Sequence, residues 1–160
     1  MRVVEALRAL GHTAEPVMLS ASARTAQEAA DAVGVELGQI VKSVVFRRKL
    51  DDAAVIVATS GDRRVDEKLV AALVGGVRRA DADFVKAATG FSIGGVAMVG
   101  HAHPPVMLID RNLFRFDVIW TGAGHPHALL PLTPDDLERL TGAPVADVTE
   151  VPKPDVGGAS

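Results

Sequence analysis

Two apolar, β-branched segments separated by a short charged stretch constrain the fold of this chain most strongly. Residues 39–46 (QIVKSVVF) and 53–59 (AAVIVAT) have the composition of buried strands. The charged residues 47–52 between them favour a turn, so the two segments are predicted to pair as a β-hairpin. A hairpin this apolar indicates a sheet that is covered by other elements.

Short strand patterns alternate irregularly with helix patterns along the rest of the chain. Thr25, Asp66, Asp81 or Asp83, and Thr133 are suitable N-caps for four helices. Further strands are expected at 77–80, 106–109, 116–120, 127–132 and 145–148. This order predicts an α+β fold, in which helices cover a mixed, strongly curved sheet. No long linker interrupts residues 1–150, which we expect to form one domain, followed by a flexible tail at 151–160.

Composition excludes several classes of protein. The chain has 160 residues, of which 48% are hydrophobic and 23% charged, and this excludes a chain that is disordered throughout. The absence of cysteine excludes disulfides, thiolate metal sites and cysteine nucleophiles. A net charge of −3 argues against coating of nucleic acid by a basic surface, but leaves room for a local basic patch. No membrane span or signal peptide is evident, so we expect a cytoplasmic protein without a membrane partner.

Lys42 is the first candidate functional residue. It lies within an apolar strand and shares the strand face of Val44 and Phe46 by alternation. A lysine is almost never fully buried without a partner. Lys42 therefore either lies on a solvent-exposed face or lines a pocket, where its ammonium would hold an anion, a phosphate or a carbonyl oxygen.

Glycine and histidine residues supply further candidates. Gly94 and Gly95 lie in a loop where backbone N–H groups can approach a ligand closely, although most such loops are ordinary connections. His101 and His103, and likewise His125 and His127, have a spacing that places each pair on one side of an extended segment. Such pairs could bind zinc, but the neighbouring prolines favour surface loops without a metal.

Two basic clusters complete the set of candidates. They are residues 47–49 (RRK) and residues 78–79 (RR). Runs of this kind are usually solvated faces, and they can also contact a few phosphates without making the whole protein basic.

Six ordered segments together resemble the YbaK family, the prolyl-tRNA-synthetase-associated editing domains. The resemblance extends over about residues 20–150. The segments are Gly38–Phe46, Ser60–Asp66, Thr89–Val96, Val99–His101, Gly122–Gly124 and Leu132–Leu137. The resemblance implies a mixed, barrel-like sheet surrounded by helices, and hydrolysis of the ester that joins a wrong amino acid to the 3′ end of a tRNA.

The resemblance also implies roles for individual residues. Lys42 is the candidate catalytic residue, and it matches a family lysine that contacts the backbone or terminal nucleotide of the substrate. The candidate substrate-binding residues are Ser43, Gly94, Gly95, Val96, Thr121, Gly122, His125 and His127. Met98 stands where the family's substrate loop has a proline. The pocket histidine of the alanine-editing members is matched by either His125 or His127.

The expected function is therefore that of a trans-acting aminoacyl-tRNA deacylase that needs no cofactor and no metal. An aminoacyl ester is already reactive, so the protein has mainly to place a water and stabilise an oxyanion. The expected partner is a tRNA acceptor end carrying a small amino acid, and an aminoacyl-tRNA synthetase is a further candidate. Two alternatives remain open, a non-catalytic module that binds aminoacyl-tRNA or a synthetase, and a histidine-based metallohydrolase.

Overall fold

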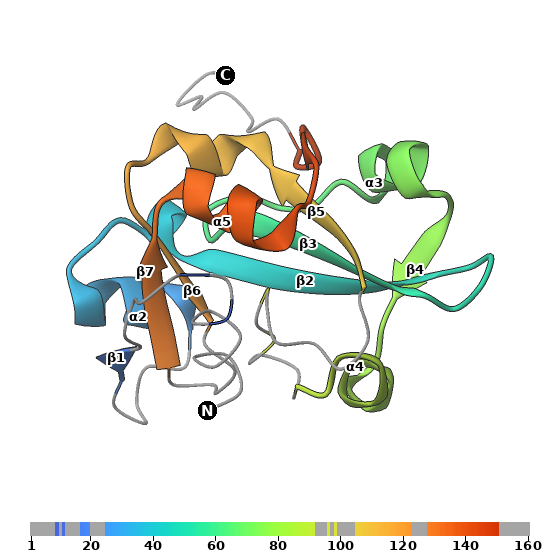
Figure 1. Cartoon of the computed structure of the whole chain (residues 1–160), viewed down its shortest axis with the longest axis horizontal. Helices are drawn as coiled ribbons and strands as arrows, with labels where there is room; N and C mark the ends of the chain where they lie inside the picture. The colour runs from blue at the N-terminus through green and yellow to red at the C-terminus, as the bar shows by residue number, and fades with distance from the viewer. Residues whose placement is uncertain are drawn as a thin grey trace, which may run out of the picture.

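The computed structural model describes residues 9, 11, 17–19, 25–91, 96, 98, 105–122 and 128–150 (Figure 1). Within these residues the chain forms both helices and strands, in irregular alternation. The helices are α2 (Ala26–Val33), α3 (Glu67–Val74), α4 (Ala82–Thr89) and α5 (Pro134–Thr141), with 3-10 turns η1 (Leu37–Gln39) and η2 (Arg111–Arg115). The strands are β1 (Val17–Met18), β2 (Val41–Arg48), β3 (Ala54–Ser60), β4 (Val77–Arg79), β5 (Val106–Asp110), β6 (Ile119–Gly122), β7 (Ala128–Leu132) and β8 (Val145–Ala146).

The predicted hairpin is confirmed and forms the centre of the larger sheet. β2 and β3 pair antiparallel from Val41–Ser60 to Arg47–Ala54, without a bulge. The full strand order is β4-β2-β3-β5-β8, in which β5 and β8 run parallel to their neighbours, so the sheet is mixed as expected. All seven residues of β3 are buried, as a central strand requires.

The described residues do not form the single barrel-like sheet that was expected. They contain a second, antiparallel sheet with the order β1-β7-β6, which crosses one end of β2 (Figure 1). The two sheets meet at one isolated bridge between Ile40 and Trp120. Because β4 pairs with the same edge of β2 only from Phe46 onward, strand pairing is not continuous, and no sheet in the described part closes into a barrel.

Both faces of the central sheet are covered, and the two faces carry separate cores. One face presents Phe46, Val55 and Val57 to Val70 of α3. The opposite face presents Ile56 and other buried residues to α4 and α5, through the side chains of Val85, Leu137 and Leu140. Figure 1 shows α3 and α4 on opposite sides of the β2–β3 hairpin, in agreement with this division.

The predicted helix starts are confirmed by their caps. Thr25, Asp66, Asp81 and Thr133 each accept a hydrogen bond from a backbone N–H in the first turn of α2, α3, α4 and α5. The strand expected at 116–120 begins later, at Ile119, because the preceding residues form η2 and the Phe116 N–H donates to the carbonyl of Leu113. No helix in the described ranges is long and apolar enough to cross a membrane. The tail expected at 151–160 lies outside these ranges.

Candidate functional site

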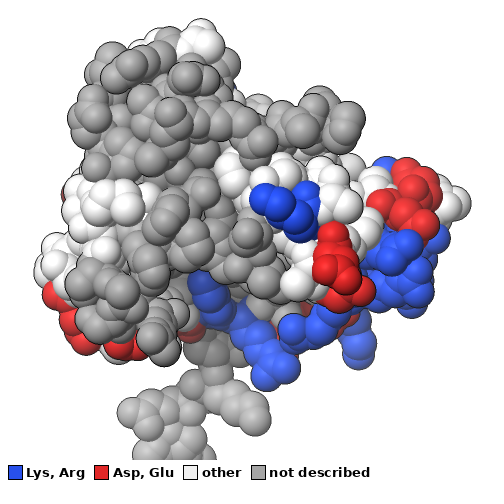
Figure 2. All heavy atoms as spheres, turned by 90° about the horizontal axis from the view of Figure 1, so that it is seen from below, with Lys and Arg blue, Asp and Glu red and all other residues white. Residues whose placement is uncertain are grey.

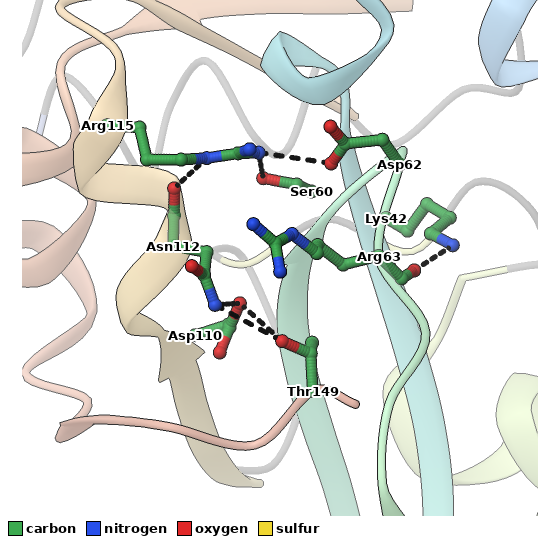
Figure 3. Close-up of polar contacts among 8 residues, drawn as sticks. All are labelled: Lys42, Ser60, Asp62, Arg63, Asp110, Asn112, Arg115 and Thr149. Atoms are coloured by element: carbon green, nitrogen blue, oxygen red, sulfur yellow. Dashed lines mark hydrogen bonds and ion pairs between the residues drawn. The ribbon is translucent and has the colours of Figure 1, made fainter. Parts of the chain in front are cut away.

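Lys42 is half-buried on β2 and is bound to the turn that follows β3. Its Nζ donates a hydrogen bond to the carbonyl of Arg63 over 2.7 Å (Figure 3). Burial lowers the pKa of Lys42 below its ordinary value, and the nearby carboxylate of Asp62 acts in the opposite direction. The Arg63 guanidinium points away from the lysine, so only the backbone of Arg63 engages it.

Lys42 faces a groove of about 400 Å³. The groove is on the side of the sheet that α3 covers, and basic side chains from several elements border it. They are Lys42, Arg64, Lys68 and Arg79, accompanied by Asp66, Glu67 and Glu150. The groove therefore combines both signs of charge, and it can hold an anionic group close to several cations.

Ser43 faces a different, smaller cavity of about 210 Å³ on the opposite side of β2. Its walls are mainly apolar and include Val45, Ala80, Val85 and Val96. Ser43 adds one hydroxyl group to this lining. The cavity thus combines a predominantly apolar surface with few polar groups, as small-molecule sites do.

The family resemblance predicts that Lys42 and Ser43 belong to one site, whereas the structure divides them between these two hollows. The reason is strand alternation, which directs successive side chains to opposite faces of a sheet. The hollows nevertheless adjoin, because Val44, Phe46 and Arg79 border both. A substrate lying across this edge of β2 could therefore reach the groove and the cavity together.

Three further candidate substrate-binding residues, Val96, Thr121 and Gly122, lie within the described residues. A Cβ atom added to Gly122 would lie 3.5 Å from the carbonyl oxygen of Val96, so these two candidates are neighbours. Thr121 is 4% exposed, and its Oγ1 has no hydrogen-bond partner among the described residues. Thr121 and Gly122 belong to β6, which extends beyond the strand expected at 116–120. Met98 is buried in the core cluster that also contains Ile56 and Val85.

Several predicted site residues lie outside the described ranges. They are Gly94, Gly95, His101, His103, His125 and His127. The described ranges hold no group of three or more acidic or histidine side chains that could bind a metal ion. The histidine-based alternative therefore rests on residues about which the structure says nothing.

Arg79 is a candidate that sequence reasoning did not separate from its neighbours. Arg47 and Arg48 are each paired with a carboxylate, and Arg78 lies 3.8 Å from Asp52. Arg79 has no ion-pair partner within the described ranges, and the same holds for Arg63, Arg64 and Lys68. Figure 2 shows Lys and Arg side chains gathered along one side of the molecule, with acidic groups among them. Strand alternation on β4 is the sequence signal that could have distinguished Arg79, because it directs Arg78 and Arg79 to opposite faces of the sheet.

A tight polar frame surrounds the start of β2. Arg115 Nη2 donates to Ser60 Oγ over 3.1 Å and to Asp62 Oδ1 over 3.0 Å (Figure 3). A Cβ atom on Gly38 would lie within 3 Å of Phe116, Arg115 and Asp62. A side chain at Gly38 would therefore have to displace the ends of these three side chains, two of which form the ion pair that holds Asp62 beside Lys42.

A model of the aminoacyl-tRNA editing domain matches residues 20–140. The chain belongs to this family. A 34% identical relative from Bacillus subtilis (strain 168), described as "Uncharacterized protein YwhH", matches over 120 residues, 75% of this chain and 76% of its own length.

Two solved structures share the fold over 94% of this chain. One is described as "a putative trans-editing enzyme for prolyl tRNA synthetase"; it is 45% identical, with a TM-score of 0.89 and 96% of its own chain covered. Another, described as "hypothetical protein APE2540", is 34% identical, with a TM-score of 0.87 and its whole chain covered. Membership of the editing-domain family supports a role in aminoacyl-tRNA editing.

Proposed function

We propose that this protein is a trans-acting deacylase that hydrolyses the ester between a small, wrongly attached amino acid and the 3′ end of a tRNA. Family membership supports the class of substrate. The observation that carries the proposal is the cavity of about 210 Å³, whose lining includes both Ser43 and Val96, two of the candidate substrate-binding residues.

The cavity favours a small acyl group. Sites for drug-sized ligands occupy roughly 300–1,000 Å³, so a hollow of about 210 Å³ suits a smaller ligand. Ala80, Val85 and Val96 are apolar, and Arg79 is the one charged residue in the described lining of the cavity. We therefore expect alanine, serine, threonine or cysteine to fit and phenylalanine to be excluded.

The groove on the other side of β2 suits the nucleotide end of the substrate. Lys42, Arg64, Lys68 and Arg79 border it, and a phosphate can interact with such side chains as point charges or as bidentate donors. The role proposed for Lys42 is therefore to bind the terminal nucleotide, since its side chain lies in the groove rather than in the cavity.

The reaction needs positioning more than a strong nucleophile. Water adds to the ester carbonyl, and the intermediate then releases the free amino acid and the ribose hydroxyl of the tRNA. Donors aimed at the developing oxyanion lower the barrier to this addition. The ribose hydroxyl next to the ester is the candidate activator of the water. The proposal places the Ser43 and Thr121 hydroxyls among the groups that orient the substrate.

The test is deacylation of tRNAs charged with alanine, serine, threonine, cysteine and, as a size control, phenylalanine. We expect turnover of at least one small aminoacyl ester, and a rate close to spontaneous hydrolysis for the phenylalanyl ester. Absence of turnover with all four small esters would contradict the deacylase. Retained binding of the charged tRNA without hydrolysis would point instead to a module that only holds aminoacyl-tRNA.

A further inference from the structure

A short segment that follows β8 lies against the turn between β3 and α3. We refer to residues 148–150 as the strap and to residues 61–66 as the turn. An antiparallel bridge joins Val65 of the turn to Thr149 of the strap. Two backbone hydrogen bonds of 2.8 Å flank this bridge, from the Asp66 N–H to the Val148 carbonyl and from the Glu150 N–H to the Arg64 carbonyl. The strap therefore fixes the backbone of the second half of the turn.

Asp110, a fully buried carboxylate at the end of β5, anchors the strap from its other side. Its Oδ1 accepts from the Val148 N–H over 3.2 Å, and its Oδ2 accepts from the Thr149 hydroxyl over 3.1 Å. The Asn112 amide donates to both Asp110 Oδ2 and Thr149 Oγ1, at 3.0 Å and 3.2 Å (Figure 3). Because a buried carboxylate needs such donors, this network sets the position of the strap.

The first half of the turn is held by the same part of the chain. Arg115 donates to Ser60 Oγ and to Asp62 Oδ1, and it belongs to η2, which follows β5 directly (Figure 3). Residues 110–115 therefore hold the turn at both ends. They contact Asp62 directly, and they reach residues 64–66 through the strap.

The turn carries the group that binds the Lys42 ammonium. The Arg63 carbonyl accepts from Lys42 Nζ over 2.7 Å, and Arg63 is the residue next to the strap-bonded Arg64. The turn and the strap also supply four residues of the groove lining, which are Arg64, Val65, Asp66 and Glu150. One wall of the groove, and the contact that orients Lys42, thus depend on how the strap is placed.

We propose that Thr149 is a positioning residue, which acts through the strap and the turn to hold the Lys42 ammonium where the terminal nucleotide of the substrate binds. The Arg63 carbonyl takes one of the three N–H donors of the ammonium and leaves the others for a ligand. A lysine fixed in this way loses less side-chain freedom when it binds. The strap lies beyond residues 20–140, which the family model matches, so this role adds to the site a segment outside that match.

The proposal rests on the deacylase function, and a pair of substitutions at Thr149 tests it. Thr149→Val keeps the shape of the side chain and removes the hydroxyl, whereas Thr149→Ser keeps the hydroxyl. In Thr149→Val the Asp110 carboxylate retains its donors from Asn112 and Val148. We expect Thr149→Val to raise KM for aminoacyl-tRNA about threefold with kcat unchanged, because a looser lysine must be ordered on binding. Thr149→Ser should keep the wild-type KM.

Coupling to Lys42 separates positioning from a general loss of stability. In the Lys42→Met background there is no ammonium to position, so Thr149→Val should change KM by less than about 1.5-fold. Thr141→Val is the control, since it removes a hydroxyl that bonds the Leu137 carbonyl within α5, and it should leave KM unchanged. The same increase in KM with and without Lys42 would overturn the positioning role while the deacylase stands.

Amide hydrogen exchange tests the strap without turnover. The Asp66 and Glu150 amides, which join the turn and the strap, should exchange faster in Thr149→Val relative to the Ile56 amide of β3. Wild-type exchange rates at both amides would overturn the proposal.

A stable analogue covers the case in which no ester is hydrolysed and the deacylase fails. The probe is a tRNA acceptor end that carries alanine through an amide bond. A Kd for this probe that Thr149→Val raises only when Lys42 is present would support the positioning role at a binding site. An unchanged Kd, or no binding to the wild-type protein, would overturn it.

Discussion

The basic side chains at the two ends of β2 have different kinds of partner. At the hairpin tip, Arg47 is 2.8 Å from Asp52, and Arg48 is 2.8 Å from Asp51. At the opposite end, Lys42 contacts a backbone carbonyl. Arg47 and Arg48 are therefore each paired with a carboxylate of the tip, whereas Lys42 has no ion-pair partner among the described residues.

The contrast between the ends shows that a run of basic residues does not reveal where positive charge is available. Arg47 and Arg48 are neutralised by acids within five residues, in the hairpin turn itself. Lys42 and Arg79 border one groove only because β4 pairs with β2 and α3 packs nearby. Matched substitutions at the two ends of β2 test this difference.

The largest effect is expected from filling the cavity. Ala80→Phe places an aromatic ring in a hollow of about 210 Å³ and should lower kcat/KM for the preferred aminoacyl-tRNA by about 100-fold, as misplacement of a substrate by about 1 Å does. Ala72→Phe, on the exposed side of α3, is the control and should leave the rate unchanged. Equal rates for the two variants in single-turnover assays would contradict the cavity as the acyl site.

Gly38→Ala and Gly76→Ala compare the packing of the two ends. An added Cβ at Gly38 would meet Phe116, Arg115 and Asp62 within 3 Å, whereas at Gly76 the nearest atom is Lys49 Cδ at 3.5 Å. We expect Gly38→Ala to lower the free energy of unfolding by about 1–3 kcal/mol and Gly76→Ala to be close to neutral. Urea denaturation measures the free energy of unfolding of both variants. Equal values would show that the side chains around Gly38 move aside at little cost.

Lys42→Met and Lys49→Met each remove one positive charge, one from each end. We expect Lys42→Met to raise KM for aminoacyl-tRNA about tenfold, the cost of one charge-assisted hydrogen bond, with kcat little changed. Its KM should also depend less steeply on salt. Lys49→Met, at an exposed position of the tip, should change KM less than twofold. A fall in kcat at constant KM for Lys42→Met would instead place the ammonium at the reacting ester.

The smallest effect concerns acid stability at the tip. Hydrogen bonds from Arg48 and from the Ala53 N–H lower the pKa of Asp51 from 3.8 to about 2. Stabilisation by the ionised carboxylate is therefore complete above about pH 4 and is lost as the pH falls towards 2. Asp51→Asn should lose less stability than the wild type over this interval. Thermal melts at closely spaced pH values measure the difference, and superimposable curves would mean that the pair contributes nothing.

Local patterns predicted the elements that local interactions stabilise. The β-branched residues on both sides of 47–52 predicted the hairpin, and the side chains of Thr25, Asp66 and Thr133 predicted three helix starts. The α+β class with a mixed sheet followed from the same patterns. The division into two sheets did not, because it depends on where β6 meets β2, at a bridge between residues 80 positions apart.

The candidate site was predictable in residue type but not in arrangement. Alternation already placed Lys42 on the face of Val44 and Phe46, and the structure agrees. Alternation could not say that a hollow exists on each side of β2, or that Arg79 borders both. Those features depend on how α3, α4 and β4 pack against the strand.

The sequence alone determined the central hairpin, the helix caps and membership of the editing-domain family, because these depend on residues close together in the chain or on an ordered set of motifs. The tertiary structure, by contrast, sets which charges are paired and where the groove and the cavity form. β4 ends at Arg79 shortly before α4 begins, and the cavity there is lined by residues of β2, α4 and the segment around Val96, which are distant in the sequence. The physical reason is that strand pairing and charge neutralisation are satisfied through space, by partners that sequence proximity does not identify.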